Sequence, residues 1–475
     1  MARHFLASIT RNRISLAGVA LSVASLTLIL ALLVIKLIGF EGGPYLGIVT
    51  FLGLPALFAL GLIIIPIGVY FERKKMREHP EYAGRPPFPV IDLNNARSRQ
   101  SVLVFLVLTI INVVILAAAT YKGVHVMETV EFCGATCHVV MEPEYTAYQR
   151  SAHARVTCAE CHIGAGADWF VKSKISGSWQ LVSVAFDLYP RPVPSPVENL
   201  RPARETCEEC HWPTRYVGDK LVVKKVYADD EANTESTTAL LMHIGGVESP
   251  GAHGGHDEAH GIHWHVDPHV QIRYLSDEKR LQVYDIELTD HDGNVKLFKN
   301  GETPPDAIER GWRTMDCIDC HNRPTHRYRM PDDEVDAAIA DGRIDEGLPF
   351  IRREAVRILE EEYPSKEAAQ EQIALAVKAF YEEGYPDVAG TKADSIQLAA
   401  DSIAQIWAWN VFPKMNVTWG TYPDHSNHQG EGGCFRCHDR KHSTADGEKI
   451  SRKCTLCHTV LAQEEEGFEV AGALK

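Results

Sequence analysis

The chain has 475 residues and a net charge of -15, and its 45% hydrophobic content is ordinary for a globular protein. That length allows two or three domains, while the acidic balance excludes a nucleic-acid partner, which would need a basic surface. The charge is uneven, because residues 123–475 carry 36 Lys and Arg against 58 Asp and Glu, a net charge of -22. A protein steered electrostatically to this larger part should therefore be basic.

Three apolar segments precede the first cysteine, at residues 14–35, 45–71 and 101–121. Each is long enough to cross a hydrocarbon core as a helix, which takes about 20 residues. A buried helix of a soluble domain is the alternative for any one of them, but three in succession favour a membrane anchor. Lys and Arg gather before the first segment and between the second and third. The positive-inside rule then predicts a multi-pass protein of the bacterial inner membrane, with a cytoplasmic N-terminus and everything after the third span periplasmic.

All twelve cysteines fall into six pairs, and every pair is followed directly by a histidine. Five pairs have the spacing C-x-x-C-H, and the first, CGATCH, has one residue more. In this pattern the two thiols bond to a haem and the adjacent imidazole binds its iron on the same face. The predicted attachment residues are Cys133, Cys137 and His138; Cys158, Cys161 and His162; Cys207, Cys210 and His211; Cys317, Cys320 and His321; Cys434, Cys437 and His438; and Cys454, Cys457 and His458.

Zinc sites and disulfides are the alternative uses of paired cysteines. Neither requires a histidine after the second cysteine of every pair, so the pattern favours six covalently attached c-type haems. The extra residue of CGATCH bulges its turn but still lets both sulfurs reach a porphyrin.

Electron-transfer haems of this kind take a second strong iron ligand, so about five of the remaining histidines should bind iron. Position along the chain favours His153, His243, His265, His326, His425 and His442. Met141, three residues after His138, is a candidate ligand for the first haem, with simple packing as the alternative. The run containing His253, His256 and His260 is Gly-rich and acidic, and is typical of a flexible loop or an adventitious metal site.

These features predict a multihaem cytochrome c with three N-terminal transmembrane helices and a mainly α, loop-rich, haem-packed periplasmic region with a small β insert. We expect an anchor at 1–121, three haems at 122–217, a β-containing insert with the fourth haem at 218–330, a helical region at 331–412 and two haems at 413–475. The segment 168–188 has the composition of an amphipathic helix at the membrane surface, although packing against haem would require the same residues.

The stretches CGATCHVVMEPEYTAYQRSAHARVTCAECH, RPARETCEECHWP and CIDCHNRPTH resemble the NapC/NirT family of membrane quinol dehydrogenases, over roughly residues 101–327. The extra spans, the insert and the two C-terminal haems resemble an enlarged branch, the inner-membrane cytochromes that begin extracellular electron transfer in metal-reducing bacteria. The resemblance implies that membrane quinol is oxidised beside the first haem and that electrons leave to periplasmic c-type cytochromes or other soluble redox proteins. It also implies axial roles for His153, His326 and Met141.

The chain departs from the family pattern in the extra residue of its first motif and in a methionine displaced by one position. A carboxylate matching the one near the first haem of the tetrahaem members is not evident. Asp168, Lys172 and Lys174 are the nearest polar residues, either as a quinol site or, for the lysines, as residues at a lipid surface. Two other functions stay open: a terminal reductase of a small oxidant, which needs an open iron site, and a relay subunit of a larger respiratory complex without its own quinol site.

Overall fold

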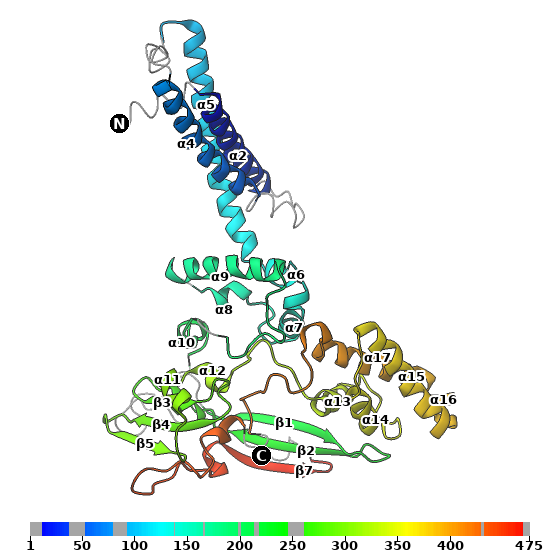
Figure 1. Cartoon of the computed structure of the whole chain (residues 1–475). Coiled ribbons are helices and arrows are strands. Elements are labelled where there is room, and N and C mark those ends of the chain that lie inside the picture. The colour runs from blue at the N-terminus through cyan, green and yellow to red at the C-terminus, as the bar shows by residue number, and fades with distance from the viewer. Residues whose placement is uncertain are drawn as a thin grey trace. The chain divides into compact units, whose positions relative to one another are not determined.

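The computed structural model describes residues 12–37, 53–78, 93–136, 138–164, 167–197, 201–212, 218–245, 261–428 and 432–468 (Figure 1). The chain divides into two compact units, Met1–Thr136 and Cys137–Lys475. The sequence predicted five regions instead of two units. The borders between those five regions stay a prediction.

The first unit is helical and contains α2 (Arg13–Leu37), α4 (Leu54–Glu78), α5 (Ala96–Met127) and α6 (Val130–Ala135). Small residues let α2 and α4 approach closely: a Cβ added to Gly18 would lie 2.8 Å from the carbonyl oxygen of Gly61. The Ser15 hydroxyl donates across the same contact to the Ile65 carbonyl at 3.0 Å. Close backbone packing through Gly and Ser is the usual way in which apolar helices associate within a bilayer.

Two helices of this unit are long and apolar enough to cross a membrane, judged by length and composition over the described residues: Arg13–Leu32 in α2 and Leu54–Lys75 in α4. The third predicted span, 101–121, lies within the 32-residue helix α5. Over its described residues α5 does not meet the same criterion, so the structure supports two of the three predicted spans.

In the second unit, the haem motifs lie on short helical turns. These elements are α7 (His138–Gln149), α8 (Cys158–His162), α10 (Ala203–Cys207), α12 (Cys317–Cys320), and the 3-10 turns η6 (Gly433–Arg436) and η7 (Cys454–Leu456). Capping boxes start two of them, because Thr157 and Glu160 cap α8 and Asp316 and Asp319 cap α12. One helical turn brings cysteines three residues apart to the same face, as attachment to one macrocycle requires.

The β structure forms two antiparallel sheets, whereas the sequence predicted one. The first has the order β1 (Lys220–Tyr227), β2 (Glu235–Met242) and β7 (His458–Glu465). The second has the order β5 (Val295–Lys299), β4 (Val283–Thr289), β3 (Gln271–Ser276) and β6 (Arg313–Thr314). The sequence did not indicate β7, which starts at the last motif histidine and pairs its backbone with β2 more than 200 residues earlier.

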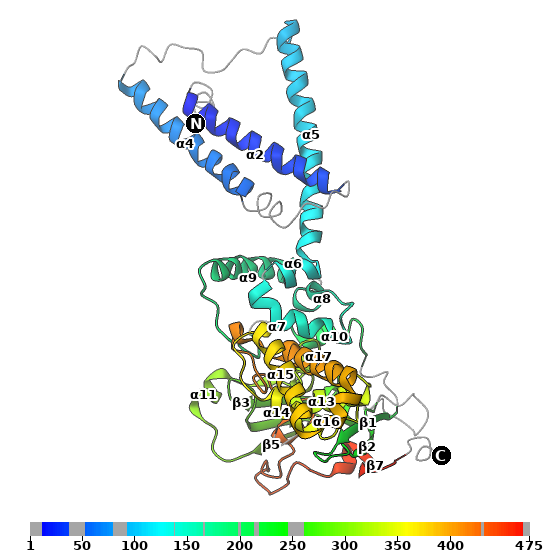
Figure 2. The ribbon, with the colours of Figure 1, turned by 90° about the vertical axis from the view of Figure 1, so that its right-hand side faces the viewer.

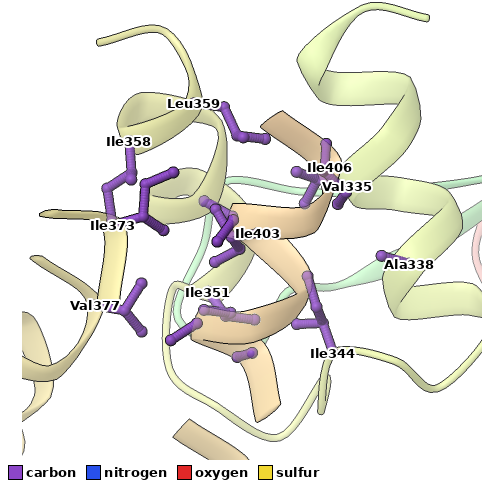
Figure 3. Packing of buried hydrophobic residues seen from close by; sticks show 14 of the residues in the cluster. Val335, Ala338, Ile344, Ile351, Ile358, Leu359, Ile373, Val377, Ile403 and Ile406 are labelled. Carbon is purple, nitrogen blue, oxygen red and sulfur yellow. The ribbon is translucent and has the colours of Figure 1, made fainter. Parts of the chain in front are cut away.

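The helices α13 (Pro331–Ala340), α14 (Ile351–Leu359), α15 (Lys366–Gly384), α16 (Pro386–Thr391) and α17 (Ala393–Asn410) pack together as one group (Figure 2). Their shared core is aliphatic and aromatic, and Ile351, Ile373 and Ile403 are fully buried in it (Figure 3). The predicted helices of this segment are confirmed, and α16 is added to them. Three further described elements of the second unit precede α13: the helix α9 (Ala167–Ala185), which confirms the predicted helix at 168–188, the 3-10 turn η4 (Gly261–Val266) and the helix α11 (Pro305–Arg310). The 3-10 turn η5 (Pro413–Met415) follows α17.

Candidate haem-binding sites

The motif cysteines of the described chain are not joined by disulfides. Nor do the described residues contain a group of three or more His, Cys, Asp or Glu side chains placed to hold a metal ion by themselves. The described motif thiols are therefore arranged differently from a disulfide framework or a four-ligand zinc site.

His162, of the second motif, faces His326, and their ring centres lie 6.2 Å apart. The Nδ1 of His326 lies 3.0 Å from the carbonyl oxygen of Glu144 on α7, which directs the other ring nitrogen toward His162. Burial lowers the pKa of both imidazoles. A neutral imidazole is the form that binds a metal.

His211, of the third motif, faces His153, with ring centres 5.9 Å apart and ring planes 74° to one another. His153 lies in the turn between α7 and α8, which the hydroxyl of Tyr148 holds by donating to the carbonyls of Ala154 and Val156. Position along the chain left open which motif His153 and His326 each serve. The structure places His153 against the third motif and His326 against the second.

His438, of the fifth motif, faces His265, and their ring centres lie 5.8 Å apart. His265 belongs to η4, and its Nδ1 lies 2.8 Å from the carbonyl oxygen of Ile262. The Nδ1 of His438 in turn faces the carbonyl oxygen of Ser451. Both rings therefore place Nδ1 against a backbone carbonyl, which is the orienting hydrogen bond found around metal-bound histidines.

His458, of the sixth motif, faces His428, with ring centres 6.2 Å apart and ring planes 22° to one another. His428 also stacks on Phe435, at 4.4 Å between ring centres. Phe435 lies between the two cysteines of the fifth motif. This stacking therefore joins the surroundings of the last two motifs.

The four pairs share one spacing, and each joins a motif histidine to a histidine outside any motif. Two metal–nitrogen bonds of about 2 Å, and about 1.1 Å from each nitrogen to its ring centre, separate two axial imidazoles by roughly 6 Å. The observed separations of 5.8 to 6.2 Å match that value. The residues present thus fit an iron porphyrin with a histidine on each face.

The fourth motif has a neighbouring histidine as well. Burial lowers the pKa of His263, and the nearby His321 lowers it further. Burial likewise lowers the pKa of His321. His263 and His265 both belong to η4, so this short turn presents one histidine toward the fourth motif and the next toward the fifth.

Three of the histidines favoured by sequence position are placed differently. Both ring nitrogens of His243 have partners, with Nδ1 2.9 Å from Asp219 Oδ1 and Nε2 3.1 Å from Thr459 Oγ1. His243 therefore links β2 to the start of β7 instead of pointing an open nitrogen at a motif.

His442 is fully buried, and its Nδ1 lies 3.0 Å from Asp439 Oδ1. His425 is buried beside the fourth motif, where desolvation and the nearby Arg436 lower its pKa to about 4. Within the described chain, neither ring is paired with a motif histidine in the way that His428 and His265 are. The fold brings His263 and His428 to motif histidines, while axial roles for His425 and His442 stay a prediction.

Part of the first motif lies outside the described residues, which include neither Cys137 nor the side chain of His138. Met141 is half-buried on α7. The side chains of Asp168 and Lys174 are also outside the described set, while Lys172 is exposed on α9 with its Nζ 4.3 Å from the ring centre of Trp169. Exposed apolar side chains continue along this helix, including Ile175, Trp179 and Leu181.

The attachment cysteines approach one another in the order of the sequence. Helix α10 packs beside both α8 and α12. Hydrogen bonding to the Cys317 thiol is the main reason that the pKa of Cys207 is raised. Burial raises the pKa of Cys320 to about 12, and the neighbouring Cys434 adds to that effect. Burial also raises the pKa of Cys457, again with a contribution from Cys434. Motifs two to six therefore form one continuous succession in space.

Comparison with known proteins gives two matches. Residues 95–191 match the NapC/NirT cytochrome c family, N-terminal region. The cytochrome c-type protein ImcH of Geobacter sulfurreducens is 41% identical over 470 residues, which cover 98% of this chain and 90% of that protein. No solved structure matches the chain.

Proposed function

Because the chain belongs to the NapC/NirT cytochrome c family, in the branch of inner-membrane cytochromes of metal-reducing bacteria, we propose that it oxidises membrane quinol and passes the electrons through six haems to periplasmic redox proteins. Membership makes the chain a membrane-associated multihaem cytochrome with covalently bound c-type haem, acting in electron transfer. The observation that carries the proposal is the set of histidine pairs on successive motifs.

The proposed haem ligands follow from these pairs. His162 with His326, His211 with His153, His438 with His265 and His458 with His428 hold four irons, at ring separations of 5.8 to 6.2 Å. His321 with His263 holds a fifth, and His138 with Met141 the first in sequence. Each bound haem supplies a one-electron iron couple.

Histidines on both faces of an iron favour electron transfer over terminal reduction, because a haem that binds a small oxidant needs an open coordination position. The chain's own contribution is to hold these ligands rigidly and to exclude water from them. Thr157, Asp316 and their capping partners stabilise the turns that carry the cysteines, and the Nδ1 contacts of His265 and His326 orient the iron-binding nitrogen.

For the membrane part, we propose the multi-pass topology that the sequence predicts, with the N-terminus cytoplasmic and the haem region periplasmic. The helices α2 and α4 support it by length and composition, and α5 would supply the third span. The five regions at 1–121, 122–217, 218–330, 331–412 and 413–475 belong to the same proposal.

We further propose that the quinol head group binds beside the first motif, at the N-terminal part of α9. Asp168, Lys172 and Lys174 lie there on less than two turns of helix. These residue types suit the reaction, because lysine ammonium groups donate hydrogen bonds to the quinol oxygens and an aspartate carboxylate accepts a proton. The exposed apolar side chains farther along α9 suit a membrane surface. Each quinol releases two electrons and two protons, and a haem held at the first motif would supply a couple that takes the electrons one at a time.

The net charge of -22 on residues 123–475 supports a basic docking partner, such as a periplasmic c-type cytochrome, on the outer side. Because the attachment cysteines of motifs two to six follow one another in space, we propose that the electrons pass through the haems in sequence order. The sixth motif, where Cys454 and Leu456 are exposed, would then be the point of exit.

The test is quinol-dependent haem reduction in the purified, detergent-solubilised holoprotein. A menaquinol analogue should reduce the haems, a quinol-site inhibitor should block that reduction, and dithionite should still reduce them. Lys172→Gln should slow the quinol reaction about tenfold, the effect of losing roughly 1.4 kcal/mol of charged hydrogen bonding. Lys378→Gln, at an exposed lysine of α15, is the matched control and should leave the rate unchanged. A fully haem-loaded sample that no quinol reduces would overturn the quinol step and favour a relay subunit.

A further inference from the structure

Glu144 and Arg323 form a largely buried ion pair next to His326. Arg323 Nη2 donates to both carboxylate oxygens of Glu144, at 2.8 and 2.9 Å, and the two side chains are only 10% and 16% exposed. Arg323 Nε donates to the carbonyl oxygen of His326 at 2.6 Å. The guanidinium also lies over the ring of Tyr422, with 4.0 Å from Cζ to the ring centre. These contacts hold the arginine in one orientation.

The same carboxylate contacts the histidine ring. His326 Nδ1 lies 3.1 Å from Glu144 Oε2 and 3.0 Å from the Glu144 carbonyl oxygen. A carboxylate that accepts from the outer nitrogen of a metal-bound histidine makes the imidazole a stronger electron donor. The Arg323 guanidinium, 2.8 Å from the same carboxylate, attracts part of its negative charge. The arginine therefore reduces the increase in donor strength of the imidazole, because opposite charges interact strongly away from bulk water.

We propose that Glu144 and Arg323 are a positioning pair that sets the donor strength of His326 and thereby the reduction potential of the haem attached at Cys158 and Cys161. This inference rests on the proposed function, in which His326 is the second ligand of that haem. Glu144 belongs to α7, the helix that begins at His138 of the first motif. The pair thus connects the helix of the quinol-side haem to a ligand of the next haem in the succession.

The two partners should shift the potential in opposite directions. Oxidised iron carries one more positive charge than reduced iron, so a nearby carboxylate stabilises the oxidised form and a nearby guanidinium the reduced form. Glu144→Gln should therefore raise the reduction potential of this haem. At a fixed solution potential, the ratio of oxidised to reduced haem should change at least tenfold, which corresponds to about 59 mV for one electron. Arg323→Gln should lower the potential by a comparable factor. Glu144→Asp, which keeps the charge, should restore most of the wild-type value.

The measurement is a potentiometric titration of the full-length holoprotein, followed by the electron paramagnetic resonance signals of its low-spin haems. The matched control is Glu142→Gln, because Glu142 lies on the same helix but pairs with Lys366 at 2.7 Å and does not contact His326. Its potentials and resonance positions should match the wild type. Haem content and thermal unfolding of every variant show whether it has folded.

No change of potential in either variant, or a change of the same sign in both, would overturn the inference. If Glu144→Gln or Arg323→Gln does not fold, Glu144→Asp and Arg323→Lys provide the test through a changed resonance position of one low-spin haem. His326→Ala separates the two levels of the argument. If it leaves every haem low-spin, the ligand assignment in the proposed function fails; if it opens one haem while the Glu144 and Arg323 variants change nothing, only the positioning role fails.

Discussion

Replacing His265 by alanine should convert one haem, the one attached at Cys434 and Cys437, from low-spin to high-spin iron. The ring centres of His265 and His438 lie 5.8 Å apart, so removal of one ring opens one face of that iron. The nearest ring beside His265 is Trp264, at 5.8 Å, and an indole N–H is a donor that cannot replace the lost ligand. If the chain carries the six proposed haems, about one sixth of the low-spin intensity should be lost.

The assay is the low-spin and high-spin ferric resonance signal of purified protein, together with carbon monoxide binding by the reduced form. His243→Ala is the informative control, because sequence position favours both histidines while the structure engages both nitrogens of His243 with Asp219 and Thr459. This control should remain fully low-spin. A high-spin haem in His243→Ala, or none in a fully loaded His265→Ala protein, would refute the ring-spacing argument.

Three further outcomes are expected. His428→Ala should open the sixth haem in the same spectroscopic assay, whereas His425→Ala should open none; the reverse result would contradict the pairing. Ile373→Ala removes a fully buried side chain from the core of the helical group and should lower the free energy of unfolding by about 2–5 kcal/mol in denaturant titrations, without loss of haem. Burial and Arg436 lower the pKa of His425 to about 4, below the value of roughly 6.5 in an unfolded chain, so the unfolded state takes up a proton that the folded state does not. Stability should therefore fall as the pH is lowered through that interval, and His425→Gln should flatten the dependence in thermal unfolding measured at several pH values.

Much of this protein could be predicted from local patterns. The six Cys–Cys–His turns follow from spacing alone, because the chemistry of attachment needs the two thiols and the imidazole within one turn of chain. The helices at 331–410 follow from 3.6-residue apolar periodicity, and the structure buries apolar side chains of this segment, including Ile373 and Ile403. The apolar segments at 14–35 and 45–71 were evident in the same way, since length and composition decide whether a helix can cross a bilayer.

The tertiary structure alone decided which histidines meet. His153 lies five residues before Cys158 yet faces His211, and His326 lies five residues after His321 yet faces His162. His243 stood out by position, but strand pairing between β2 and β7 places it against Thr459. Proximity along the chain does not indicate which side chain lies across a macrocycle, because the two ligands approach from opposite faces and the backbone must pass around the group between them. That arrangement depends on contacts between segments more than 200 residues apart, and only the folded chain brings them together.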